Sequence, residues 1–325
     1  MVYRALNLSR FHPAGVLLMA IGLVLVLQGF AALLTLATAS VAWGVPIEDL
    51  QRLVAADDAG QQTWLLLLWI NAAAQVVSFG GAAVLLAAGY ANPRQVLGWA
   101  PPAPVWGVGV AALWVIVAQP FMGFFALDAD SFALPESLSA FERAAEAAEA
   151  AVAQQIERIL QAPLWLSLLS LALLPAVFEE LIFRGLVLSL LRRWLGLHAA
   201  VWVQGVLFGL VHFQVYGLVP RVFLGVAFGY FRVTTGSLVP AIVAHLVNNA
   251  STVGLYLALT QPEDDPTTQL PFPFVLASGV LAVGLIAYLY RRRVPAVRLA
   301  PDPVAPSLPP LAVLPPETQE EPPRG

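Results

Sequence analysis

The chain has 325 residues and a formal net charge of -4; 59% of its residues are hydrophobic and only 11% are charged, which gives a mean hydropathy of +0.78. An ordinary soluble domain carries about 25% charged residues, so the composition excludes one and predicts a polytopic membrane protein. Nucleic-acid binding is excluded because the one basic cluster, Arg291–Arg293, flanks an apolar run, and the lack of Cys excludes disulfides, thiolate catalysis and Cys-ligated zinc.

The first half of the chain contains three apolar runs long enough to cross a bilayer, over residues 14–42, 63–88 and 105–127. The first run is longer than the apolar core of a signal peptide, which has about 7–15 residues, so we expect it to be a retained span. An Ala- and Glu-rich stretch from Ser139 onward predicts a helix with an acidic face. Such a helix is typical of a solvated connector.

Five further apolar runs follow this connector. Those over residues 164–191, 238–259 and 272–290 are long enough to span, whereas 199–213 and 218–231 fall below the usual length of about 20 residues. Short, glycine-interrupted segments in a membrane protein often border a cavity rather than lipid. The chain is therefore expected to be all-α, a polytopic integral membrane protein with about eight transmembrane helices.

Loop charges and composition predict the organisation around these spans. Apart from Arg221, arginines concentrate in alternate loops. Positive charge is in excess on the cytoplasmic side of membrane proteins, so we expect both termini in the cytoplasm. We divide the chain into residues 1–160, with about three transmembrane helices and the acidic connector, and a second membrane domain over residues 161–293. Residues 294–325 are rich in Pro and end acidic, which predicts a disordered tail.

Glu179 and Glu180 are the only carboxylates between Ile159 and Pro262, and they fall inside an apolar run. Each charged side chain at the centre of a membrane helix costs about 2.5–3.5 kcal/mol, so such residues normally face a bundle interior or a cavity and are functional by default. On a helix Arg184 shares a face with Glu180, whereas Glu179 points about 100° away. This spacing predicts a Glu180–Arg184 pair and leaves Glu179 free for general-base chemistry. The alternative is a structural ion-pair cluster that fixes helix packing.

Two histidines, His212 and His245, lie deep in the apolar segments that follow. Phe208 precedes His212 by four residues, and Asn249 follows His245 by four, so each pair shares a helix face. Alone, each residue is typical of packing or hydrogen bonding between helices. Together with the carboxylates and the guanidinium, they are groups suited to proton transfer and oxyanion binding. Five other amides are expected to hydrogen-bond between helices: Gln28, Asn71, Gln75, Gln119 and Gln204.

Three motifs therefore occur in order on successive apolar segments: Glu179-Glu180-x-x-x-Arg184, Phe208-x-x-x-His212 and His245-x-x-x-Asn249. In this order they resemble the CPBP family of intramembrane proteases, the CAAX protease and bacteriocin-processing (Abi) group related to the type II CAAX prenyl endopeptidase. The resemblance covers roughly residues 164–259, about a third of the chain, and implies that residues 161–293 form a catalytic membrane domain. It also implies that about eight helices surround a conical cavity. The implied roles are general base for Glu179, helped by His212, support of the site for Glu180 and Arg184, and oxyanion stabilisation for His245 and Asn249.

A metal-dependent mechanism would use Glu179, His212 and His245 as zinc ligands. The sequence has no His-Glu-x-x-His motif, and a Glu179 bound to metal would no longer be available as the base. We therefore expect a metal-independent glutamate mechanism with no cofactor.

The expected function is hydrolysis of peptide bonds in membrane-associated, or prenylated, peptides within a bacterial cell membrane. The expected partners are membrane lipid and a peptide or membrane-protein substrate, with no nucleic acid. The alternative is a non-enzymatic transporter or scaffold with a buried Glu, Arg and His cluster, in which Glu179 would relay protons or cations.

Overall fold

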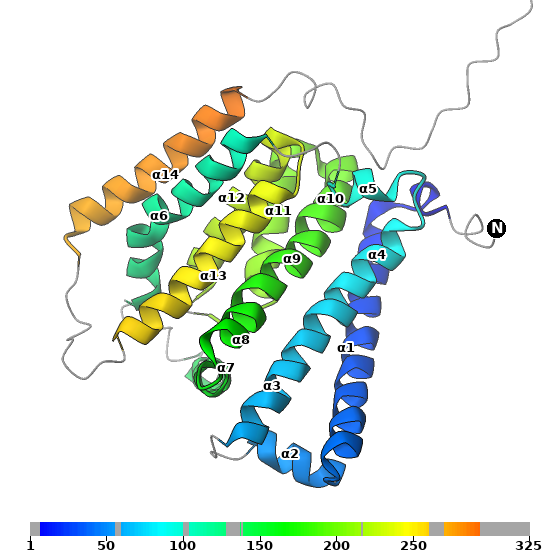
Figure 1. Cartoon of the computed structure of the whole chain (residues 1–325). Coiled ribbons are helices and arrows are strands. Elements are labelled where there is room, and N and C mark those ends of the chain that lie inside the picture. Colours follow the sequence, from blue (N-terminus) through cyan, green and yellow to red (C-terminus); the bar gives the residue numbers. More distant parts are fainter. Residues whose placement is uncertain are drawn as a thin grey trace, which may run out of the picture.

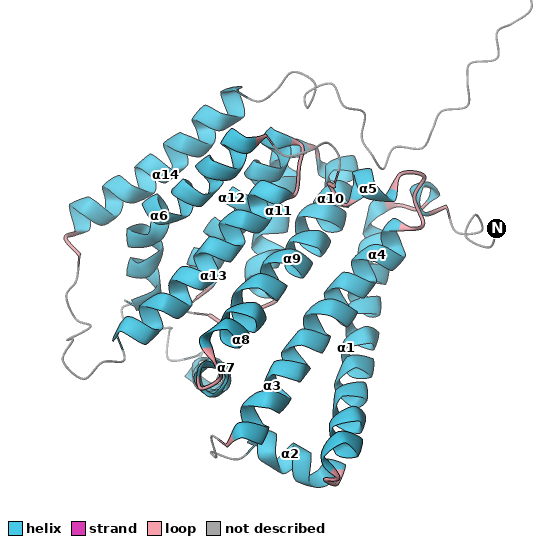
Figure 2. Cartoon of the chain, in the orientation of Figure 1, coloured by secondary structure: helices cyan, strands magenta, loops and turns pink. Residues whose placement is uncertain are grey.

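The computed structural model describes residues 7–55, 60–99, 104–127, 137, 139–215, 217–259 and 270–292. Figure 2 shows that these residues form helices joined by turns and loops, with no strand among them. The longer helical elements are α1 (Pro13–Trp43), α2 (Ile47–Ala55), α3 (Gln61–Ala73), η2 (Ala74–Gly80), α4 (Gly81–Ala87), α5 (Pro93–Val96), α6 (Val105–Leu127), α7 (Ser139–Leu160), α8 (Leu164–Leu168), η5 (Leu169–Leu173), α9 (Leu174–Glu180), η6 (Leu181–Val187), α10 (Leu188–Leu195), α11 (Leu197–Leu210), α12 (Leu218–Thr235), α13 (Val239–Leu259) and α14 (Phe272–Arg292).

Six of the described helices are long and apolar enough to cross a membrane, and they confirm the prediction of an all-α polytopic membrane protein. They are Pro13–Trp43, Gln61–Ala87, Val105–Phe125, Leu164–Leu195, Val239–Ala258 and Phe272–Arg292. The expected count of about eight included two more runs, which form α11 and α12. With 14 residues, α11 is about 21 Å long, shorter than the hydrocarbon core of about 30 Å. Two arginines, Arg221 and Arg232, make α12 less apolar.

The helices form a row with two shorter helices packed against it (Figure 1). In the row, α14 contacts α6, α6 contacts α13, α13 contacts α9, α9 contacts η2, and η2 contacts α1. The two shorter helices, α11 and α12, pack against each other, and α12 also packs on α6 and α13. In Figure 1, α7 is seen end-on, so it runs across the bundle rather than along it.

Two large apolar clusters hold the bundle together. The first joins α1, α4, η6, α10 and α11 and includes Phe183 and Phe208. The second joins α6, α12, α13 and α14 around Trp114, whose indole donates to the carbonyl of Ala282 at 2.9 Å. Phe208 in the first cluster and Phe228 in the second both contact the ring of His245. The polar site therefore lies where the two clusters meet.

The arginines predicted to face the cytoplasm lie at one end of the bundle, as far as the structure describes them. Arg193 donates to the carbonyl of Ser9 at 2.9 Å, which joins the end of α10 to the start of α1. Arg232 packs directly against Gly98, and its charge interacts with that of Arg192. This is the end that carries α5 and the last turn of α14 (Figure 1). Residues 293–325, which include the predicted tail, lie outside the described residues.

The acidic stretch forms α7, a mostly exposed helix, as predicted. Its last turns pack on the first membrane hairpin. Arg158 donates to the carbonyl of Val54 at 2.9 Å, and Ile159 packs with Leu67 and Leu68 of α3. The connector is therefore fixed to the first membrane hairpin at the end opposite the arginines.

Candidate active site

Three π-helical segments interrupt the α-helices around the polar cluster. Each contributes one residue: Gln75 from η2, Leu171 from η5 and Arg184 from η6. A π turn inserts an extra residue into the helical repeat, which changes the direction of side chains and frees backbone carbonyls from the helix. In η5 the carbonyl of Leu171 accepts a side-chain hydrogen bond from Asn249, at 3.2 Å. The π segments thus provide both side-chain placement and backbone acceptors.

Glu180 is the fully buried centre of an ion-pair network. Its Oε1 accepts hydrogen bonds from Arg184 Nη1 at 2.6 Å and from His245 Nδ1 at 2.9 Å. Arg184, also fully buried, donates through Nη2 to the carbonyl of Gly225 at 3.1 Å, and its guanidinium lies 4.2 Å above the ring of Phe208. The predicted Glu180–Arg184 pair is confirmed. His245 also bonds to Glu180, a contact that helix geometry alone did not predict.

Glu179 has different surroundings from its neighbour. No arginine is paired with it among the described residues; instead its Oε1 accepts a hydrogen bond from Gln75 Nε2 at 3.0 Å. Its Oε2 lies 3.9 Å from His245 Nε2, too far for a direct hydrogen bond. The residue is 9% exposed, whereas Glu180 is not exposed at all. The two adjacent carboxylates therefore differ as predicted: one is held by an arginine and the other is not.

The two histidines offer different ring nitrogens to the site. The Nδ1 atom of His212 lies 2.8 Å from the carbonyl of Phe208, which can only accept, so Nδ1 carries the proton and Nε2 of the neutral ring is an acceptor. In His245, Nδ1 donates to the carboxylate of Glu180, and Nε2 points toward Glu179. The ring of Phe208 lies between the histidines, with its centroid 5.1 Å from that of His212 and 5.8 Å from that of His245.

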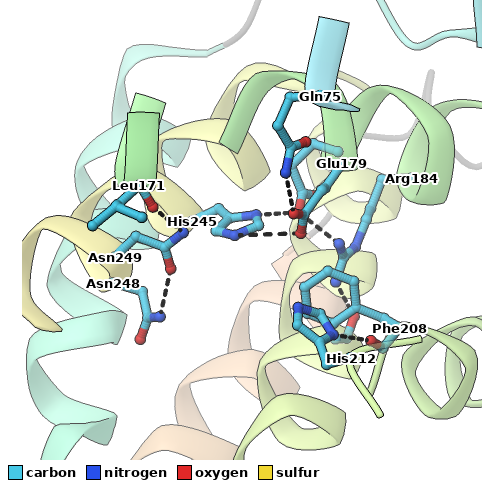
Figure 3. A network of polar contacts seen from close by, with 11 residues as sticks. Gln75, Leu171, Glu179, Arg184, Phe208, His212, His245, Asn248 and Asn249 are labelled. Carbon is cyan, nitrogen blue, oxygen red and sulfur yellow. Dashed lines mark hydrogen bonds and ion pairs between the residues drawn. The ribbon is translucent and has the colours of Figure 1, made fainter. Parts of the chain in front are cut away.

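Asn249 lies one turn beyond His245 on α13 (Figure 3). Its amide nitrogen donates to the carbonyl of Leu171, and its oxygen accepts a hydrogen bond from Asn248 Nδ2 at 3.1 Å. One of its two amide hydrogens is thus used within the protein, and the other is available to a bound group.

Five of the six predicted residues contact one another or contact the ring of Phe208, and Asn249 lies one turn away on α13. The contacts run through Phe208, whose ring meets Arg184 and both histidines, and through Glu180. No sequence pattern predicted that Gln75, 104 positions before Glu179, would donate a hydrogen bond to it. Its presence in an apolar span predicted only a hydrogen bond between helices.

A zinc-dependent mechanism would use Glu179, His212 and His245 as ligands. Among the described residues no group of three or more His, Cys, Asp or Glu side chains could hold a metal ion.

The fold and the cluster define an integral membrane protein with a buried site of carboxylates and imidazoles. Residues 161–251 match the family described as type II CAAX prenyl endopeptidase Rce1-like, over less than a third of the chain. This segment contains all six predicted site residues, and the match confirms the resemblance that the three motifs carry. The similarity of this segment supports a CAAX-type intramembrane peptidase in general terms. No curated protein and no solved structure matches the chain.

Proposed function

We propose that this protein is a glutamate-type intramembrane endopeptidase, in which Glu179 activates water to hydrolyse peptide bonds of membrane-associated or prenylated peptides. The observation that carries the proposal is the contrast between two adjacent buried carboxylates. Glu180 is neutralised by Arg184, whereas Glu179 has only an amide hydrogen bond and faces an imidazole. The family match of residues 161–251 supports peptidase chemistry at this cluster.

The first chemical step is attack of water on the peptide carbonyl. Glu179 Oε2 takes one proton from the water while the water oxygen bonds to the carbonyl carbon. The carbonyl oxygen then becomes an oxyanion. His212, with Nε2 as an acceptor, helps to orient the water. When the intermediate collapses, the C–N bond breaks, and the proton held by Glu179 passes to the leaving nitrogen.

His245 is suited to stabilise the oxyanion. Its Nδ1 is held by Glu180, so Nε2 is the ring nitrogen that faces Glu179 and would donate to the oxyanion when it carries a proton. A donor aimed at developing negative charge is a large contributor to acyl-transfer catalysis, especially where water is excluded. Asn249 would supply a second donor through its unused amide hydrogen. Glu180 and Arg184 would hold this arrangement in shape.

We further propose that the reaction needs no metal or cofactor and that the protein works in a bacterial cell membrane. The end of the bundle rich in arginine, with the first described residues and the end of α14, would face the cytoplasm. Lipid and a peptide or membrane-protein substrate are the partners.

Substitution of the base tests the proposal. In lipid nanodiscs, Glu179→Gln should lower the cleavage rate of a prenylated reporter peptide about 100- to 10,000-fold, the usual contribution of a general base. Glu146→Gln, on the exposed face of α7, is the matched control and should keep the rate.

Three outcomes would contradict the proposal. Unchanged cleavage by a folded Glu179→Gln protein would remove the base. Proton-coupled uptake without cleavage, lost in the same variant, would indicate a transporter. Stoichiometric zinc in the purified protein, with cleavage lost on chelation, would contradict the metal-independent mechanism.

A further inference from the structure

We infer that Gln75, in the first membrane hairpin, is a positioning residue that orients the Glu179 carboxylate. This inference rests on the proposed function of Glu179. It concerns a residue outside the segment that matches the family, which begins at residue 161. The site would then be completed by a helix that the family match does not include.

The amide and the carboxylate meet directly. Gln75 Nε2 lies 3.0 Å from Glu179 Oε1, and Gln75 is 7% exposed (Figure 3). An ionised carboxylate only accepts hydrogen bonds, so the amide must present its NH₂ group and turn Oε1 away. That Oε1 atom is buried without a hydrogen-bond partner among the described residues. The amide orientation is therefore set by Glu179 and by no other described group.

The local backbone explains how Gln75 reaches across. It lies in η2, the π segment between α3 and α4, which packs on α9. The approach is close at Gly80, where an added Cβ would lie 2.6 Å from Cδ1 of Phe178, the residue before Glu179. One turn before Gln75, Asn71 donates at 2.8 Å to both the carbonyl and the hydroxyl of Ser170. Two amides on one face thus fix the register between this helix and the helix that carries Glu179.

Gln75 differs in kind from the other groups that act on Glu179. Those groups are ionisable. Glu180 is adjacent to Glu179 in the chain, and His245 faces Glu179 from α13. The charge of Glu179 also acts on Arg184, His212 and Arg221. Gln75 is uncharged and holds one carboxylate oxygen in place. Because Oε1 is engaged, Oε2 is the oxygen left to take the proton from water. A fixed carboxylate also avoids the cost of reorientation during the reaction.

The test is Gln75→Met, which keeps the length and apolar bulk of the side chain and removes the donor. Hydrogen bonds to charged groups contribute about 1.5–3 kcal/mol, so kcat should fall about 10- to 100-fold. KM should stay within about twofold of the wild-type value, because Gln75 does not take part in substrate binding. A role confined to helix packing would instead lower thermal stability and leave the kcat of the folded fraction unchanged.

Gln204→Met is the matched control. Gln204 is a fully buried amide in α11, and neither of its polar side-chain atoms has a hydrogen-bond partner among the described residues. The Gln204→Met variant should have the wild-type kcat. A loss of kcat equal to that of Gln75→Met would overturn the inference, as would a wild-type kcat in Gln75→Met. If Gln75→Met does not fold, Gln75→Asn is tested instead, because it retracts the amide by one methylene. This variant should also lower kcat at constant KM. A wild-type kcat in Gln75→Asn would overturn the inference too.

Parallel measurement of Glu179→Gln separates the two proposals. If Glu179→Gln abolishes cleavage and Gln75→Met does not reduce it, only the positioning role fails. If Glu179→Gln cleaves normally, the proposed function fails first. A second readout is independent of turnover: a hydrophobic carbodiimide modifies protonated carboxyl groups, and loss of the donor should speed labelling of Glu179, measured by mass spectrometry. An equal labelling rate with an unchanged kcat would overturn the inference.

Discussion

At the scale of single residues, one carboxylate oxygen organises most of the cluster. Oε1 of Glu180 accepts from both Arg184 and His245, while its Oε2 is buried without a hydrogen bond among the described residues. The guanidinium is further held between the faces of Phe208 and Phe228, at 4.2 and 5.1 Å. Such cation–π contacts gain strength when they are desolvated.

This network predicts an unequal response to removal of its members. Arg184→Met should cost about 3–5 kcal/mol of stability, because it leaves the buried Glu180 charge without its main partner. The double variant Glu180→Gln with Arg184→Met should cost less than Arg184→Met alone, since no buried charge is left unpaired. Denaturant unfolding in mild detergent, followed by tryptophan fluorescence, measures both.

The exposed pair Arg52–Asp49 supplies the control for this experiment. Its side chains are 81% and 49% exposed, and Arg52→Met should change stability little, because exposed ion pairs are weak. A double variant less stable than Arg184→Met would contradict the explanation by unpaired charge.

At this scale, the sequence predicts contacts within a helix but not contacts between distant helices. The Glu180–Arg184 pair follows from a spacing of four residues, and so does the difference between Glu179 and Glu180. The hydrogen bond from Gln75 does not, because it depends on how two helices are placed in three dimensions. The protonated nitrogen of His212 is also set by a local carbonyl that only the folded backbone presents.

At the scale of elements, all eight apolar runs form helices, but their irregularities are not visible in the sequence. The π segments η2, η5 and η6 contain no residue pattern that distinguishes them from an α-helix. The two short runs were predicted to border a cavity, and their packing has a clear cause. Gly205 and Gly225 bring α11 and α12 into backbone contact.

This contact predicts that Gly225→Ala is destabilising. An added Cβ would lie 2.8 Å from both Cα and O of Gly205, and backbone atoms cannot move aside as a flexible side chain can. Overpacking of this kind costs about 1–3 kcal/mol. The same unfolding assay measures the loss, which should also lower cleavage because Arg184 donates to the Gly225 carbonyl.

Gly254→Ala provides the comparison within the membrane. An added Cβ there meets nothing within 4 Å, so alanine should be neutral or slightly stabilising, given its higher helix propensity. If both alanine variants unfold alike, the close contact of α11 and α12 is not what the stability depends on.

At the scale of the whole molecule, the arrangement of arginines predicts the orientation in the membrane. The chain has no Cys, so single cysteines can be introduced without a background. Ala91→Cys, exposed between α4 and α5 at the arginine-rich end, should react with an impermeant maleimide only after the cells are opened. Gln51→Cys, exposed on α2 at the other end, should react on intact cells. Reversed labelling would invert the proposed topology.

The glycine contact between α11 and α12 also has a mechanical consequence for how a peptide gains entry. Two backbones that touch without intervening side chains cannot slide or pivot without a collision or a void. We therefore expect α11 and α12 to move together. Under the proposed function, a peptide would then have to enter between other helices of the bundle.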